Sequence, residues 1–366
     1  MSAPDQRPFL ERLGVRTLER RHGAVSSSAP KASSDGVVHL IDADERAALS
    51  RIERAALVRA ALAGATSALI SAIAEVSVQD HETTDPVFYW GVIAAAGGTA
   101  AVLEIVFLSW DALRTVQRMS VAAGVLIVDD DAQRAQVLTT LARAALEVPN
   151  PPTSAFGVNP HKEANKLLLV GAALLYKLKV SATNLLFKQL VRRILGRAAV
   201  RGFLPFLAIP GTALWDFLVC RVVLREARLR IFGPSLAADV VARLLPAGHP
   251  VSPLLVEALM RAAASCVVRT ADLHPNLELL LAALVKRLQA PVPASVDDSA
   301  AFLALLPTLD EADAAVVSRF LRAAAVIDGR VARRERALLR DAGAWIDDEV
   351  ESERRRVLSG EPLLLA

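Results

Sequence analysis

Two long apolar stretches separated by a short acidic segment are the feature that most constrains this fold. The stretches are Ala60–Val78 and Val87–Trp110, and the segment between them carries three carboxylates, Asp80, Glu82 and Asp85. A helix needs about 20 predominantly apolar residues to cross the hydrocarbon core of a bilayer, and both stretches approach that length. We therefore predict a transmembrane helical hairpin.

Aromatic residues mark the ends of the second stretch. Trp90 and Trp110 are 20 positions apart, which is about 30 Å along a helix and matches the hydrocarbon thickness. Tryptophan prefers the membrane–water interface, so this interval is typical of a span. The first stretch is weaker, because its charge-free core, Ala60–Ala74, has only 15 residues. An Ala-rich helical pair of a soluble protein is the alternative.

Small residues recur at four-residue spacing in both stretches. They are Gly64, Ala68 and Ala72 in the first and Ala94 and Gly98 in the second. Such faces let helix backbones approach closely in lipid, so they predict a tightly packed hairpin.

The flanking charges predict an orientation. Basic residues precede and follow the hairpin, whereas its turn is acidic; the basic residues are Arg46, Arg51, Arg54, Arg59, Arg114 and Arg118. The positive-inside rule then places both termini in the cytosol. The abundance of Ala, Leu and Arg is typical of a GC-rich bacterial genome, so we expect the bacterial inner membrane.

A second apolar region, residues 163–232, is interrupted by charge. Lys177 and Lys179 lie in the middle of its first stretch, and Asp216 lies in its second. Pro210-Gly211 predicts a break in the second stretch that would suit a re-entrant turn. A lysine at the centre of a span costs about 2.5–3.5 kcal/mol. The connection between the stretches presents one basic face, formed by Lys188, Arg192, Arg193, Arg197 and Arg201. We predict a membrane-associated or re-entrant hairpin whose basic face contacts anionic lipid headgroups, with a second spanning pair as the alternative.

The rest of the chain predicts a soluble helical bundle. Apolar residues recur at helical spacing in 253–269, 277–288, 312–326 and 332–342, and Gly233-Pro234 predicts a break before them. The fold class is therefore all-α. The expected parts are a polar N-terminal segment with a Ser-rich linker (1–54), the hairpin and a following helix (55–147), a Pro-rich linker (148–162), the basic hairpin (163–232) and the bundle (233–366).

One helix junction in this bundle carries a motif. Asp328-Gly329-Arg330-Val331, followed by Glu335, resembles the Asp-Gly-x-Val-x-x-x-Glu junction of tellurite-resistance-B-like helical domains. The resemblance implies a bundle of that kind over about residues 235–350 and divalent cations near the acidic residues, so Asp328 and Glu335 are the candidate metal ligands. A Gly-terminated helix followed by a first-turn glutamate explains the same residues without a metal.

No pattern of a catalytic site is present in the sequence. The six His and two Cys have no metal-binding or disulfide spacing, and no P-loop or nucleophile–base pair is recognisable. We therefore expect neither an enzyme nor a cofactor, and the net charge of +3 with few aromatics argues against nucleic acid.

Three functions follow from these patterns. The first is a membrane-tethered interaction or scaffold module that binds a protein partner through its bundle. The second is a small transporter or channel component that uses intramembrane polar residues, for which the candidates are Glu104, Lys177, Lys179 and Asp216. The third is a peripheral lipid-binding helical protein without a span.

Overall fold

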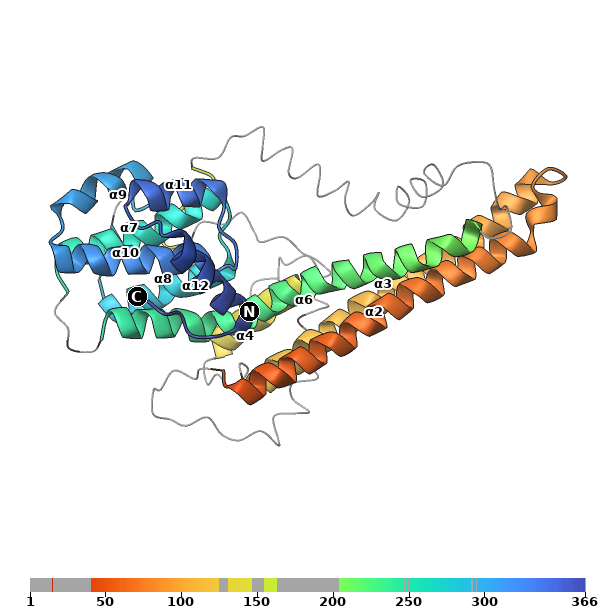
Figure 1. Ribbon diagram of the computed structural model, residues 1–366, viewed down its shortest axis with the longest axis horizontal. Coiled ribbons are helices and arrows are strands. Elements are labelled where there is room, and N and C mark those ends of the chain that lie inside the picture. The colour runs from red at the N-terminus through yellow and green to blue at the C-terminus, as the bar shows by residue number, and fades with distance from the viewer. Residues whose placement is uncertain are drawn as a thin grey trace, which may run out of the picture. The chain divides into compact units, whose positions relative to one another are not determined.

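The computed structural model describes residues 41–124, 131–146, 155–162 and 204–365, except 247, 249, 250, 291 and 294, and also Val15. Its regular elements are all helices, which confirms the all-α class (Figure 1). They are α2 (Ala43–Ser77), η1 (Gln79–His81), α3 (Pro86–Ala122), α4 (Asp131–Ala145), α6 (Leu204–Leu244), α7 (Pro253–Thr270), α8 (Pro275–Leu288), α9 (Ser299–Leu305), η2 (Leu306–Thr308), α10 (Glu311–Val326), α11 (Arg333–Asp341) and α12 (Asp347–Ser359). The helices predicted from apolar spacing correspond to α7, α8, α10 and α11.

The chain forms two compact units, which are described separately. The apolar unit comprises residues 50–118 and 167–224, of which 167–203 lie outside the described part. The bundle unit comprises residues 1–49, 119–166 and 225–366. Three helices, α2, α3 and α6, contribute residues to both units.

In the apolar unit, α2 and α3 form the predicted hairpin around the short turn at η1. Both helices are long and apolar enough to cross a membrane, judged by length and composition. Figure 1 shows the two helices side by side, with the beginning of α6 next to them. Only 11% of the most apolar 18-residue segment of α3 is buried, and 39% of the corresponding segment of α2. The core helix of a soluble protein, by contrast, is mostly buried.

The chain breaks predicted at Pro210-Gly211 and Gly233-Pro234 are wrong, because α6 continues through both. An interior proline usually costs about 3 kcal/mol, since it removes a donor and its ring crowds the preceding turn. Side chains donate to helix carbonyls near both positions. Thr212 Oγ1 donates to Ala208 O at 2.8 Å, and Asn276 Nδ2, from another helix, donates to Leu229 O at 3.0 Å.

The bundle unit is built around α7. This helix packs against α8, α9, α10 and α11, and α10 also contacts α12. Every residue from Ala262 to Val268 is buried, as expected for a helix that is surrounded on all sides. Side chains cap four of its helix N-termini by accepting backbone N–H groups: Ser252 for α7, His274 for α8, Asp298 for α9 and Asp310 for α10.

Candidate functional site

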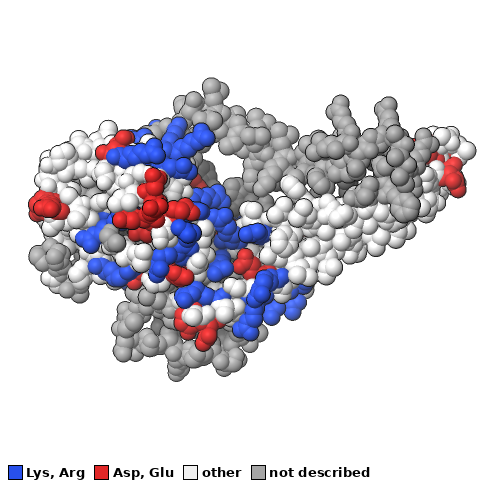
Figure 2. Space-filling model, in the orientation of Figure 1, with Lys and Arg blue, Asp and Glu red and all other residues white. Residues whose placement is uncertain are grey.

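The apolar unit exposes a continuous set of large aliphatic side chains, which we call the aliphatic face. Each of these side chains is 44–63% exposed; they are Val58, Leu62, Ile70 and Ile73 of α2, Val102, Leu103, Ile105 and Val106 of α3, and Leu214, Leu218 and Val222 of α6. Figure 2 shows the described surface of this unit almost free of charged side chains between its ends. Soluble monomers rarely expose apolar patches of this extent.

Aromatic and charged groups meet at the end of the hairpin where α2 begins and α3 ends. Trp110 is 40% exposed, and the Arg114 guanidinium lies 5.3 Å from its ring centroid. One position further along α3, Asp111 Oδ1 accepts a hydrogen bond from Arg59 Nε at 2.9 Å. Arg59 Nη2 also donates to Thr115 Oγ1 at 3.2 Å. This end therefore holds an ion pair beside an exposed aromatic residue.

Two of the four intramembrane candidates are brought together inside the unit. Glu104 and Asp216 are 7% and 5% exposed, and their carboxyl groups are close enough to interact electrostatically. Asp216 Oδ2 is buried without a hydrogen-bond partner. Glu104 precedes Asp111 by seven positions, which is about 10 Å along α3. The other candidates, Lys177 and Lys179, lie outside the described residues, as do Lys188, Arg192, Arg193, Arg197 and Arg201 of the predicted basic face.

Gly64 of α2 makes room for this carboxyl pair. A Cβ atom at Gly64 would lie 2.4 Å from Asp216 Oδ2 and 2.9 Å from the backbone oxygen of Thr212. The small-residue face of α2 is thus packed, and Ala68 and Ala72 on it are 3% and 2% exposed. The small-residue face predicted on α3 is not packed in this way, since a Cβ atom at Gly98 would meet nothing within 4 Å.

A second polar cluster lies in the bundle unit, where α6 meets the N-terminus of α8. Glu226 Oε1 accepts a hydrogen bond from Arg230 Nε at 2.9 Å and lies 3.0 Å from His274 Nε2. His274 Nδ1 accepts from the backbone N–H of Asn276, which leaves the ring proton for Nε2. Burial opposes ionisation of Glu226, but hydrogen bonds and charges from His274 and Arg230 outweigh it and hold the pKa of Glu226 at about 2.

Asn276 ties three helices together. Its side chain is fully buried, and Nδ2 donates to Leu229 O of α6 at 3.0 Å and to Ile327 O after α10 at 2.9 Å. Gly233 makes this approach possible, because a Cβ atom there would lie 2.2 Å from Asn276 Oδ1. This contact positions the α10–α11 junction against α6.

The candidate metal ligands Asp328 and Glu335 bond to nearby backbone at that junction. Asp328 Oδ1 accepts from Arg330 N and Glu335 Oε2 accepts from Ala332 N, both at 2.8 Å. Glu335 Oε1 is buried without a hydrogen-bond partner. Among the described residues no three His, Cys, Asp or Glu side chains are placed to hold a metal ion. The two carboxylates act here as local caps of the junction.

Replacing Glu335 with glutamine is expected to stabilise the protein increasingly as pH rises. Burial, reinforced by the Asp328 carboxylate, raises the pKa of Glu335 well above its ordinary value. The unfolded chain loses this proton near pH 4.3 while the native state keeps it, so the contribution of Glu335 to stability falls as pH rises above that value. Glutamine does not titrate and keeps the acceptor for Ala332 N.

Thermal unfolding of both proteins between pH 4 and pH 8 tests this expectation. The difference in Tm, Glu335→Gln minus wild type, should become more positive with pH. The control is Glu351→Gln, because the Glu351 side chain is 48% exposed and exposed ion pairs contribute at most about 1 kcal/mol. A Tm difference that does not change with pH would contradict the argument.

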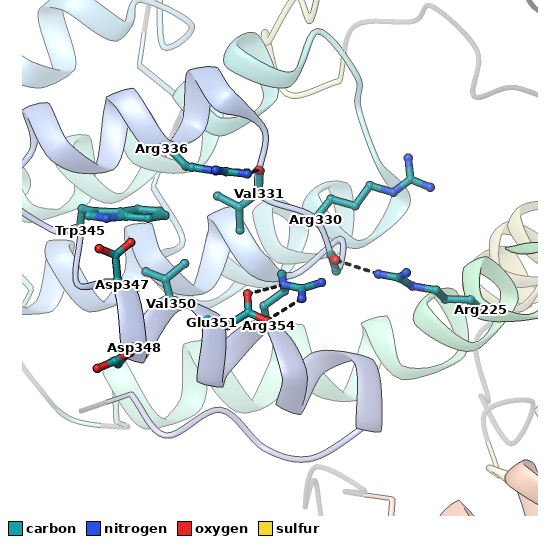
Figure 3. Close-up of a pocket in the computed structure, with 11 residues that line it drawn as sticks. Arg225, Arg330, Val331, Arg336, Trp345, Asp347, Asp348, Val350, Glu351 and Arg354 are labelled. Carbon is teal, nitrogen blue, oxygen red and sulfur yellow. Dashed lines mark hydrogen bonds and ion pairs between the residues drawn. The ribbon is translucent and has the colours of Figure 1, made fainter.

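A pocket of about 600 Å³ opens beside the same junction (Figure 3). Its lining comes from α6, the α10–α11 turn, α11 and α12, and includes Arg225, Arg330, Trp345, Asp347 and Asp348. Sequence analysis missed it, because Arg225 and the α12 residues are more than 100 positions apart and form no local motif.

Comparison with known proteins gives no relative for this arrangement. No protein-family model, curated protein or solved structure matches the chain. Functional conclusions therefore depend on the geometry of the two units alone.

Proposed function

We propose that this protein is a membrane-anchored, non-catalytic interaction module. Its apolar unit is the anchor, and its bundle unit binds a protein partner at the cytosolic face of a bacterial inner membrane. The observation that carries the proposal is the aliphatic face, which extends over α2, α3 and α6. Moving such side chains out of water contributes about 25 cal/mol per Å² of apolar surface, and lipid is the solvent that can cover this face.

The ends of the hairpin support the same placement. Trp90 and Trp110 are both exposed on the continuous helix α3, at an interval that matches the two interfaces of a bilayer. The turn between α2 and α3 is acidic, whereas the opposite end carries Arg59 and Arg114. By the positive-inside rule the turn faces outward and both termini lie in the cytosol.

For the bundle unit we propose a tellurite-resistance-B-like architecture. The α10–α11 junction supports this, since α10 ends at Val326, Gly329 adopts a φ of 74° and α11 begins at Arg333. A positive φ favours glycine, which is the residue that the motif has at this position.

Alkaline carbonate extraction and cysteine labelling test the anchor. The full chain should remain in the membrane pellet after extraction. In a Cys220→Ala, Cys266→Ala background, Thr83→Cys in the turn should react with an impermeant thiol reagent on intact cells. Glu311→Cys, exposed in the bundle unit, is the control and should react only after permeabilisation. Release into the supernatant would favour the peripheral lipid-binding alternative, and reversed labelling would refute the orientation.

The Glu104–Asp216 contact supports a second candidate function, a small transporter or channel component. Two neighbouring carboxyl groups inside a membrane unit are typical of proton pathways. Labelling of Leu195→Cys discriminates between the two functions. External reaction at both position 83 and position 195 would mean additional spans and favour transport, whereas internal reaction at 195 favours the anchor. For an anchor, Glu104→Gln should leave extraction unchanged.

A further inference from the structure

The pocket of the bundle unit carries opposite charges at its two ends. Figure 3 shows Arg225 and Arg330 at one end and Trp345, Asp347 and Asp348 at the other. Arg225 comes from α6 and Arg330 from the α10–α11 turn, whereas both aspartates belong to the first turn of α12. Three separate elements therefore converge on one cavity with a positive and a negative end.

Some lining charges are already satisfied and form the walls. Arg354 binds Glu351 through two hydrogen bonds of 2.8 and 2.6 Å, and Arg336 donates to Val331 O at 3.4 Å. The charge of Arg354 is thus compensated by Glu351, and the Arg336 guanidinium is bound to a backbone carbonyl. Between the two ends the wall is partly apolar, because Val331 and Val350 line it together with the Trp345 ring.

The groups at the two ends are placed for a ligand. The Arg330 side chain is 70% exposed, and the distance from its Nη2 to Glu226 Oε2 is 3.8 Å, too long for a hydrogen bond. Arg225 Nη2 donates to Gly329 O at 3.4 Å, a long contact that orients its guanidinium at the pocket. Asp347 and Asp348 form no ion pair with any residue that the structure describes.

We propose that this pocket binds a phosphoethanolamine group, which is a phosphate diester joined through two carbons to a primary ammonium. Guanidinium groups bind phosphate oxygens in a forked geometry, so the phosphate lies between Arg225 and Arg330. The ammonium lies against Asp347 and Asp348, near the Trp345 ring, over which the Arg340 guanidinium already lies at 5.4 Å from the ring centroid. A cavity of about 600 Å³ is within the usual size of small-ligand sites.

Two sources supply this chemistry, a membrane lipid headgroup and a soluble glycerophosphodiester. The lipid source rests on the proposed anchor. A phosphoglycerol group has no ammonium for the aspartates, and a phosphocholine group has an ammonium without N–H donors. The pocket therefore discriminates among headgroups.

The first arm of the test uses a soluble probe and the full chain in detergent. Titration calorimetry with glycerophosphoethanolamine should show saturable binding, and glycerophosphoglycerol should bind about tenfold more weakly or worse. Arg330→Gln and the double variant Asp347→Asn, Asp348→Asn should each weaken binding about tenfold or more. The matched control is Arg333→Gln, which changes an exposed arginine of the same junction that does not line the pocket and should bind like wild type.

The second arm identifies the source. Native mass spectrometry of the protein released from nanodiscs should show retained phosphatidylethanolamine over phosphatidylglycerol, and Arg330→Gln should abolish the preference. Binding of the soluble probe without lipid preference would support the pocket and assign it a soluble ligand. No probe binding together with equal retention of all lipids would overturn the proposal. Carbonate extraction separates the two proposals, because a protein released from membranes that still binds the probe refutes only the anchor.

Discussion

Replacing Gly64 with valine should release the first part of α6 from the α2–α3 hairpin. The new Cβ would lie 2.4 Å from Asp216 Oδ2 and 2.9 Å from Thr212 O. The Thr212 oxygen belongs to the backbone of α6, so the clash cannot be relieved by a rotamer change. Overpacking costs about 1–3 kcal/mol and more where backbone must move. Because the backbone of α6 must move, we expect a loss of about 3 kcal/mol or more.

Gly98→Val is the matched control for this variant. Gly98 also lies in the interior of a long apolar helix, but a Cβ atom there meets nothing within 4 Å. Valine has a slightly better helix propensity than glycine, so Gly98→Val should keep or slightly raise stability. Thermal unfolding in detergent and tryptic cleavage at Arg221 measure the two effects. Equal Tm losses for both variants would show that the Gly64 contact is not what holds α6.

Asn276→Leu should be the most destabilising substitution in the bundle unit. It removes both donors to Leu229 O and Ile327 O, and each buried carbonyl left without a partner costs about 1–3 kcal/mol. The branched side chain would also meet Gly233, whose backbone approaches Asn276 closely. We expect a total loss of about 3–5 kcal/mol of unfolding free energy.

Circular dichroism of thermally unfolding protein measures this effect, and Asn159→Leu is the control. Asn159 is exposed, and its Oδ1 accepts only a local hydrogen bond from His161 N, so its replacement should cost less than about 1 kcal/mol. Gly233→Ala perturbs the same contact as Asn276→Leu. The two losses should therefore not add in the double variant. Full additivity would mean that Asn276 stabilises the bundle in another way.

The elements that sequence patterns predicted well are those specified by local composition. Length and apolarity identify α2 and α3, and apolar spacing identifies α7, α8, α10 and α11. Interruptions of α6 were wrongly expected at two proline–glycine pairs, because local rules include the missing donor but not the contacts that the helix makes with the rest of the fold. At Gly233-Pro234 the side chain that approaches the helix is Asn276, which comes 43 positions after Gly233 and donates to Leu229 O.

Contacts between side chains that are distant in the sequence could not be predicted either. Glu104 and Asp216 were both recognisable as unusual charges in apolar stretches, but 112 positions separate them. Their contact depends on how α3 and α6 pack, and the glycine beneath them belongs to α2. Gly64 was expected to face α3, whereas its close contacts are with α6. A periodic pattern predicts which face of a helix is packed, but it does not predict which other helix packs against that face.

The ion pair between Arg59 and Asp111 has a consequence for biosynthesis. The ribosome adds Arg59 52 positions before its partner. A nascent α2 has only 15 uncharged residues after that arginine, which is short of the about 20 that a stable span needs. It gains both a charge partner and a packed neighbour only when α3 has been synthesised. In the proposed anchor, translation of α3 therefore completes the insertion of α2, and we expect a chain truncated before Asp111 to leave α2 at the bilayer surface.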